Sequence, residues 1–204
     1  MEEQLKSVLS RLVQDPGLQA GFLEALSELE NCGAKKIMGY QTRCNTDLSV
    51  LQHAAEETRH AYFFKKQACK FGVPSRFSFL DGKSRRYLDR LELFIARCLR
   101  ELPMLKRKEG CYVLTTYYIE QRATWLYTHY EAALRNQDAP FSLRSILQEE
   151  TGHLADMERK KEGLEVSPGI AARIQDFEAT LCAEWISNLV EIMRGYSGGV
   201  SHPI

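Results

Sequence analysis

The tetrapeptide Glu-x-x-His occurs twice in the chain, as Glu57 with His60 and as Glu150 with His153. Residues three positions apart on an α-helix lie on the same face, one turn from each other, so each motif can direct a carboxylate and an imidazole to one cation. A glutamate from each of two further helices would complete a six-ligand cage for two metal ions inside a four-helix bundle. The spacing therefore predicts a metal site built on helices.

Both motifs lie on largely apolar helical stripes. The first stripe contains Val50, His53, Ala54, Ala61 and Phe64, and the second contains Leu143, Ile146, Leu147, Leu154 and Met157. A carboxylate in such a stripe costs on the order of several kcal/mol unless a cation or a hydrogen-bonding partner compensates its charge. A bound metal is the simplest compensation.

Glu30 and Glu120 are the partner carboxylates that the same test selects. Glu30 shares its helical face with apolar and small residues, whereas Glu28 shares its face with other charged residues. Glu120 lies in a stretch that is rich in aromatic and aliphatic residues. Gly33 and Ala123 follow the two acids by three positions, which leaves room for each carboxylate to bend toward a metal.

The choice of these acids can be tested by their heights along antiparallel helices, because ligands of one site must lie at the same height. If a first hairpin turns near 43–45, Glu30 and Glu57 each lie about 12 residues, roughly 18 Å, from the turn and reach the same level. In a second hairpin, Glu120 lies about 16 residues before a break near 136 and Glu150 about 8 residues after 142, a mismatch of roughly 12 Å. Either the third bundle helix ends early or its connection folds back along it.

The composition is that of a neutral globular chain. Of its 204 residues, 44% are hydrophobic, and Lys plus Arg equals Asp plus Glu at 27 each, so no net field favours nucleic acid or an anionic membrane. No apolar run reaches the length of a membrane span, and the start lacks the features of a signal peptide. We expect a cytoplasmic protein that binds neither nucleic acid nor membrane. Its six cysteines form no Cys-x-x-Cys pair, which argues against a zinc ribbon or a rubredoxin-type iron site.

Proline positions and hydrophobic periodicity predict an all-α fold. A proline inside a helix removes a hydrogen bond and clashes with the preceding turn, so the six prolines mark the ends of helices. No stretch shows sustained strand alternation. Ser167 and Pro168 are typical of an N-cap followed by the first helical position. We expect helices near 3–14, 18–42, 46–71, 83–102, 110–135, 142–161 and 168–195.

On the ordered set Glu30, Glu57 with His60, Glu120, and Glu150 with His153, the chain resembles the ferritin-like di-iron carboxylate superfamily. This superfamily includes rubrerythrins, bacterioferritins, ribonucleotide reductase small subunits, bacterial multicomponent monooxygenases and aldehyde-deformylating oxygenases. The resemblance covers about residues 18–161. It implies a ferritin-like four-helix bundle in a single domain, 1–204, with a long helical crossover between 72 and 110 and extra N- and C-terminal helices.

The resemblance also implies two bound iron ions, or iron with manganese, and chemistry with dioxygen or peroxide. Four carboxylates would neutralise two divalent irons, and an electron-donor protein would be a natural partner. The substrate would be a small molecule that fold analogy does not name. The long crossover and the second Glu-x-x-His favour an oxidase or oxygenase over iron storage. A bacterioferritin-type ferroxidase and a metal-free helical interaction protein remain the alternatives.

Several other residues have a functional and a structural interpretation. Thr124 and Tyr127 are the candidate catalytic residues: Thr124 resembles a threonine near the metals of some monooxygenases, although a threonine that satisfies a helix carbonyl is the favoured alternative. Tyr127, with Tyr117 and Tyr118, is a candidate radical or electron carrier, or a core residue. His53 lies one turn before Glu57 and could be an extra metal ligand of the kind found in some N-oxygenases. A core residue or a residue that supports the ligands is the favoured interpretation.

The last helix carries an apolar stripe that could serve a homodimer. Its members are Ile170, Ile174, Phe177, Leu181, Trp185 and Leu189.

Overall fold

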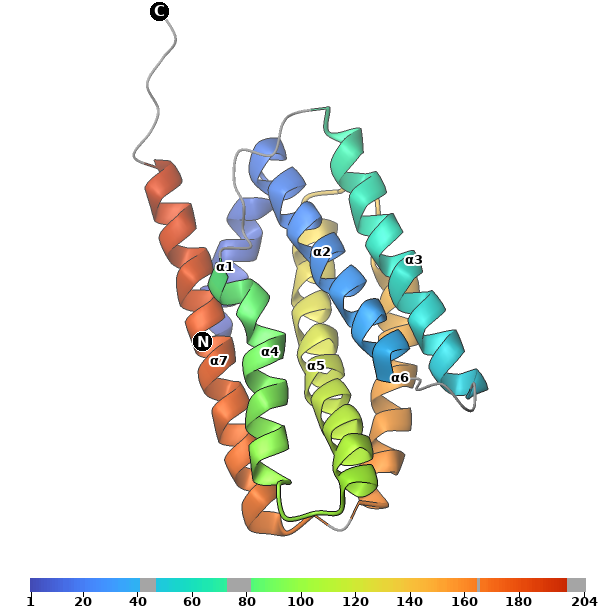
Figure 1. Cartoon of the computed structure of the whole chain (residues 1–204). Coiled ribbons are helices and arrows are strands. Elements are labelled where there is room, and N and C mark those ends of the chain that lie inside the picture. The colour runs from blue at the N-terminus through green and yellow to red at the C-terminus, as the bar shows by residue number, and fades with distance from the viewer. Residues whose placement is uncertain (41–46, 73–81, 165, 198–204) are drawn as a thin grey trace, which may run out of the picture.

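The computed structural model describes residues 1–40, 47–72, 82–164 and 166–197, and these segments are helical with no strand (Figure 1). The all-α prediction is therefore confirmed for the described part of the chain. The expected turn near 43–45 lies outside it. The helices are α1 (Glu2–Leu12), α2 (Pro16–Tyr40), α3 (Leu48–Lys70), α4 (Gly82–Cys98), α5 (Met104–Arg135), α6 (Arg144–Glu162) and α7 (Pro168–Ser197).

Four of the helices form two antiparallel pairs that face each other. Helix α2 packs along α3, α5 packs along α6, and α3 also contacts α6. Helix α4 lies between α3 and α5 in sequence and packs on α5 and α7, and Figure 1 shows it between these two helices. This arrangement is compatible with a ferritin-like bundle whose crossover contains a helix.

Local signals fix the starts of two helices. Asp47 caps α3, because its carboxylate accepts a hydrogen bond from the Ser49 backbone N–H at 2.8 Å. Ser167 caps α7 in the expected way: its hydroxyl accepts from the backbone N–H of Ile170 at 3.4 Å, and Pro168 occupies the first helical position.

Helix α5 begins six residues earlier than the sequence predicted. We expected Gly110 to start this helix, but α5 starts at Met104 and Gly110 lies inside it. The glycine serves packing: a Cβ at this position would lie 2.9 Å from Leu99 Cδ1. Gly110 therefore allows Leu99, which directly follows α4, to approach α5 closely, and it does not break α5.

The connection between α5 and α6 folds back, which answers the question raised by the second hairpin. Helix α5 continues to Arg135. Farther back on α5, Glu131 accepts hydrogen bonds from Ser142 Oγ at 3.0 and 3.1 Å and from the Leu143 backbone N–H at 2.7 Å. The start of α6 is thus held beside the last turns of α5, which reduces the difference in level between Glu120 and Glu150.

The apolar stripe of α7 packs inside the chain. Ile174, Leu181 and Leu189 are almost completely buried against neighbouring helices of the same molecule. The other three members of the stripe, Ile170, Phe177 and Trp185, are only partly buried, and the homodimer stays a prediction. No helix in the described segments combines the length and the apolar character needed to cross a membrane.

A buried ion pair joins α5 to α7. Glu178 accepts hydrogen bonds from Arg122 Nε at 2.8 Å and Arg122 Nη2 at 2.6 Å, and it also accepts from the hydroxyl of Tyr87 on α4. Because Glu178 is only 2% exposed, its charge depends on these partners. The network fixes α4 and α7 against the bundle.

Candidate metal centre

The structure brings all six predicted ligand residues into one buried cluster between the two helix pairs. Helix α2 supplies Glu30, α5 supplies Glu120, and α3 and α6 each supply a glutamate and a histidine from one Glu-x-x-His motif. Glu30 faces inward at 6% exposure, whereas Glu28 is exposed, as their helical faces predicted. The local helical period therefore identified which acids reach the interior.

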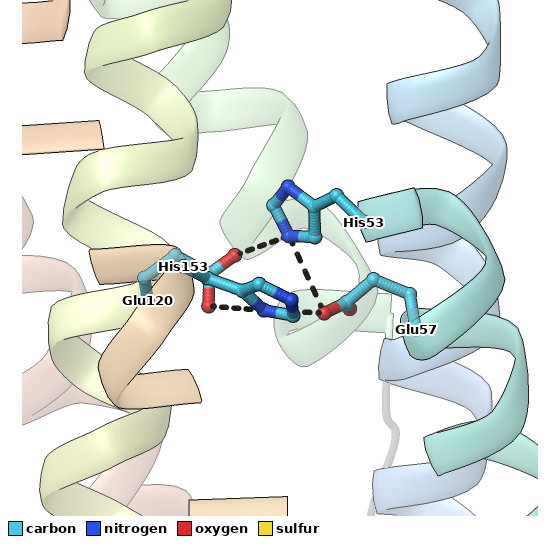
Figure 2. A group of neighbouring side chains, drawn as sticks. All are labelled: His53, Glu57, Glu120 and His153. Atoms are coloured by element: carbon cyan, nitrogen blue, oxygen red, sulfur yellow. Dashed lines mark hydrogen bonds and ion pairs between the residues drawn. The ribbon is translucent and has the colours of Figure 1, made fainter. Parts of the chain in front are cut away.

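The cluster divides into two groups of four residues. Within each group, the potential ligand atoms all lie within 4.8 Å of one another. One group contains Glu30, Glu57, His60 and Glu150, and the other contains His53, Glu57, Glu120 and His153 (Figure 2). Glu57 belongs to both groups. Two cation positions that share a carboxylate match the expected two-metal cage, and the role of these residues as ligands stays a prediction.

Short distances connect the two groups. His60 Nδ1 lies 3.0 Å from Glu150 Oε1 and 3.9 Å from Glu57 Oε1. His153 Nδ1 lies 3.5 Å from Glu150 Oε2, 3.6 Å from Glu57 Oε1 and 3.9 Å from Glu120 Oε2. Each imidazole thus directs Nδ1 at the carboxylates, and Glu150 lies between the two histidines.

His53 is the residue whose place the sequence argument underestimated. Its Nε2 lies 3.0 Å from Glu120 Oε1 and 3.5 Å from Glu57 Oε1, and its ring lies 3.9 Å from the ring of His153. Burial, and then the charge of His153, lower the pKa of His53 to about 3, so it is neutral at neutral pH and able to donate a lone pair. Its position one turn before Glu57, on the same face, is the signal that marks it.

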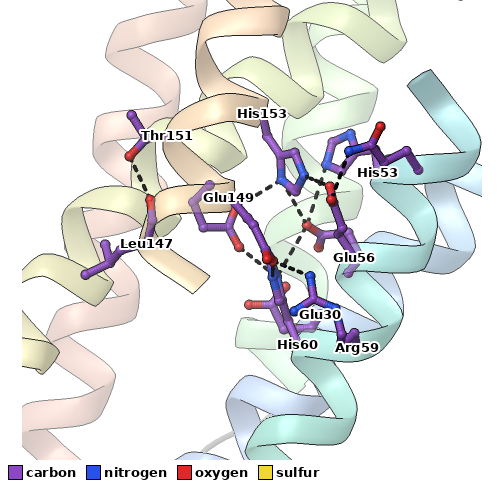
Figure 3. Close-up of polar contacts among 12 residues, drawn as sticks. Glu30, His53, Glu56, Arg59, His60, Leu147, Glu149, Thr151 and His153 are labelled. Atoms are coloured by element: carbon purple, nitrogen blue, oxygen red, sulfur yellow. Dashed lines mark hydrogen bonds and ion pairs between the residues drawn. The ribbon is translucent and has the colours of Figure 1, made fainter. Parts of the chain in front are cut away.

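The outer nitrogens of two histidines are held by acids that the sequence argument did not select (Figure 3). His60 Nε2 lies 2.7 Å from Glu149 Oε2, and His153 Nε2 lies 2.7 Å from Glu56 Oε2. The acid before each Glu-x-x-His motif therefore supports the histidine of the other motif. A proton on Nε2 that is donated to these carboxylates leaves the Nδ1 lone pair free for a metal. The signal was present in both motifs, because each begins with two consecutive glutamates.

Four inward atoms of the cluster are buried and have no hydrogen-bond partner among the described residues. They are Glu57 Oε1, Glu150 Oε1, His60 Nδ1 and His153 Nδ1. Two of them, His60 Nδ1 and Glu150 Oε1, lie 3.0 Å apart and can pair when His60 is protonated. An unsatisfied buried polar atom costs about 1–3 kcal/mol, so the others need a different compensation. Carboxylate oxygens and imidazole nitrogens suit iron, manganese and zinc. The donor set therefore fits two divalent cations.

The electrostatics of the cluster also favour bound positive charge. Burial raises the pKa of Glu30 and Glu120 well above the usual carboxyl range, and neighbouring carboxylates add to this effect. Burial, and then the charge of Glu150, raise the pKa of Glu57 to about 8. Burial opposes the charged form of His60, but the surrounding carboxylates, first Glu150 and then Glu30 and Glu149, together outweigh burial and raise its pKa to about 9. A metal that binds here must displace these protons.

Gly33 makes room for the shared carboxylate. A Cβ at this position of α2 would lie 3.1 Å from Glu57 Oε2, a distance at which Glu57 would have to move. We expected Gly33 to leave this space for Glu30, on the same helix. The structure shows that Gly33 instead accommodates Glu57 from α3.

The two candidate catalytic residues differ in their contacts. The hydroxyl of Tyr127 donates to Glu30 Oε1, and both residues are buried. The hydroxyl of Thr124 is buried and has no hydrogen-bond partner among the described residues, so it does not satisfy a helix carbonyl there. Tyr117 and Tyr118 lie in the core beside α7, where the Tyr118 hydroxyl donates to the Ala171 carbonyl at 3.2 Å. Only Tyr127 among these tyrosines has a direct bond to a predicted ligand.

Comparison with known proteins adds no relative to this picture. No protein-family model matches the chain, and neither the curated proteins nor the solved structures contain a match.

Proposed function

We propose that the chain is a di-iron carboxylate protein of the ferritin-like type, and that it uses dioxygen or peroxide to oxidise a small organic substrate. The observation that carries this proposal is the pair of buried donor groups that share Glu57. Seven converging side chains, with four inward atoms unsatisfied, are difficult to explain in a metal-free helical interaction protein. Four carboxylates among them balance the charge of two divalent irons.

In this proposal, Glu30, Glu57, His60 and Glu150 hold one iron, and His53, Glu57, Glu120 and His153 hold the other. Bound iron would supply electrons to dioxygen or peroxide. Insertion of one atom of dioxygen into a substrate requires two electrons and two protons from a reductant, and the second oxygen atom leaves as water. Tyr127, whose hydroxyl donates a hydrogen bond to Glu30, would be the source of a proton beside the metals, and this hydrogen bond supports that role.

Metal analysis after anaerobic loading with ferrous iron tests the proposal. We expect close to two irons per chain, and a large loss in the double variant Glu57→Ala, Glu150→Ala. The matched control replaces two exposed glutamates of α1 and α6, Glu3→Ala and Glu158→Ala, and should keep the full metal content. A metal content near zero in the unaltered protein, or one that the double variant does not change, would end the di-iron proposal.

Light scattering and iron uptake separate an oxygenase from an iron-storage protein. Storage requires a closed shell of many subunits around a mineral, whereas substrate oxidation needs only a pocket beside the metals. We expect a small assembly that takes up no iron beyond its site. A hollow particle that accumulates excess iron would replace the oxygenase proposal with the ferroxidase alternative.

A further inference from the structure

Two cavities adjoin the acids of the candidate metal centre. The smaller one, here called the chamber, has a volume of about 110 Å³ and extends from the acids to Ala123 on α5 and Trp185 on α7. The larger one, here called the groove, has a volume of about 960 Å³ and extends from the acids to Tyr40 on α2 and Lys108 on α5. Both are bordered by the same residues at their junction, namely Gly33, Glu57, Leu88, Ile119 and Glu120.

The chamber is apolar apart from the acids. The other polar side chains that border it are already paired: Tyr87 and Arg122 bind Glu178, and Tyr127 binds Glu30. A hydroxyl or amide that entered the chamber away from the acids would lose its water without a replacement, at a cost of about 1–3 kcal/mol. Each methylene that entered it would instead gain about 0.8 kcal/mol.

The size of the chamber limits what it can hold. A dry protein cavity of about 150 Å³ accommodates benzene, so the somewhat smaller chamber suits a short alkyl chain or a comparably narrow apolar group. The chamber is bordered by four predicted ligands, Glu30, Glu57, Glu120 and Glu150, whereas the groove is bordered by only two of them. A group inside the chamber is therefore the part of a bound molecule that faces all four of the predicted carboxylate ligands.

The groove has the mixed character that suits the rest of such a molecule. It is bordered by apolar residues and by three cations, which are Lys36, Arg107 and Lys108. Three acids outside the metal centre balance these charges, namely Asp47, Glu92 and Glu109. Lys36 is already bound to Asp89 at 3.0 Å and Glu92 at 2.5 Å. The volume of the groove lies within the range of about 300–1,000 Å³ that is common for small-molecule sites. The groove therefore suits the polar part of a ligand, without a strong preference for positive or negative charge.

We infer that the substrate is an amphipathic small molecule that inserts a narrow apolar arm into the chamber, keeps its polar body in the groove and is oxidised on the arm. This inference rests on the proposed function and deepens it, because it names the chemical class of the substrate and the end that reacts. The metal centre lies at the junction of the two cavities, so an arm that enters from the groove must pass Glu57 and Glu120.

Binding of a series of straight-chain primary alcohols, from butanol to octanol, tests the apolar arm. Trp185 borders the chamber and reports binding by its fluorescence when the other tryptophan is removed by Trp125→Phe. Affinity should rise roughly fourfold for each added methylene, which corresponds to about 0.8 kcal/mol, until the chamber is full. An affinity that does not depend on chain length would overturn the inference.

A matched pair of substitutions on α5 localises this binding. Ala123→Leu fills the chamber and should remove the gain with chain length. Ala133→Leu makes the same change ten residues farther along the helix, at a position that borders neither cavity, and should leave the gain intact. Circular dichroism and metal content verify that both variants fold. Equal chain-length dependence in the two variants would show that the alcohols bind elsewhere.

Paramagnetic relaxation identifies the end of the molecule that faces the metals. In protein loaded with Mn²⁺, the terminal methyl protons of a bound alcohol should relax faster than the protons beside its hydroxyl, and Zn²⁺-loaded protein provides the diamagnetic control. The opposite order would overturn the assignment of the reacting end. The fluorescence measurement needs no metal, so a chain that binds alcohols but no metal would refute the proposed function and leave the apolar chamber established.

Discussion

The reciprocal support of the two Glu-x-x-His motifs gives the most specific prediction. Glu149→Gln removes the charge that holds His60 Nε2, and Glu56→Gln does the same for His153 Nε2; both contacts are 2.7 Å long. A hydrogen bond to a charged group contributes about 1.5–3 kcal/mol, and loss of such an outer partner weakens metal affinity roughly 10- to 100-fold. Each single variant should therefore lose this factor at one metal position only.

Titration with Co²⁺ against a chromophoric chelator measures the two affinities separately. Glu149→Gln should weaken the position that contains His60, and Glu56→Gln the position that contains His153. Arg59, which contacts Glu149 at 2.5 Å, is 51% exposed in its side chain and should contribute little to the effect. Glu158→Gln, an exposed change on the same helix as Glu149, is the control. The reasoning would be refuted if both variants weakened the same position, or if neither changed either affinity.

Three further predictions concern the acids of the bundle. Glu30→Ala should lose much of one metal equivalent by metal analysis, because Glu30 is buried in one donor group, whereas Glu28→Ala on the exposed face should keep both; the reverse result would mean that α2 is rotated. Metal-free protein should melt at a lower temperature as the pH rises from about 7 to 9, because the folded-state pKa values of Glu57 and His60 are raised to about 8 and about 9. A group whose pKa is raised in the folded state contributes its full stability below the unfolded-state pKa and loses it as the pH rises through the folded-state pKa. A melting temperature that increases from about pH 7 to 9 in scanning fluorimetry would therefore contradict the assignment. Glu178→Ala should reduce the free energy of unfolding in urea by about 3 kcal/mol, because it leaves a partly buried guanidinium unpaired, and a loss below about 1 kcal/mol would show that solvent replaces the pair.

The sequence by itself determined the properties that depend on the helical period. The choice of Glu30 over Glu28 and the inward direction of both Glu-x-x-His pairs follow from 3.6 residues per turn and the apolar stripes beside them. The all-α class follows from proline positions and periodicity. These features are local, since each requires only that a residue and its neighbours one turn away share a face.

The tertiary structure decided which side chains from different helices meet. The spacing of residues in α3 and α6 does not show that Glu149 reaches His60 or that Glu56 reaches His153, because these contacts depend on the lateral packing of two helices. We expected a helix to start near 110, but Gly110 lies inside α5 and allows the close approach of Leu99. The return of the α5–α6 connection along Glu131 and the position of the chamber beside the acids depend on packing in the same way. Contacts between helices far apart in sequence are fixed by side-chain volume and shape, which the helical period does not determine.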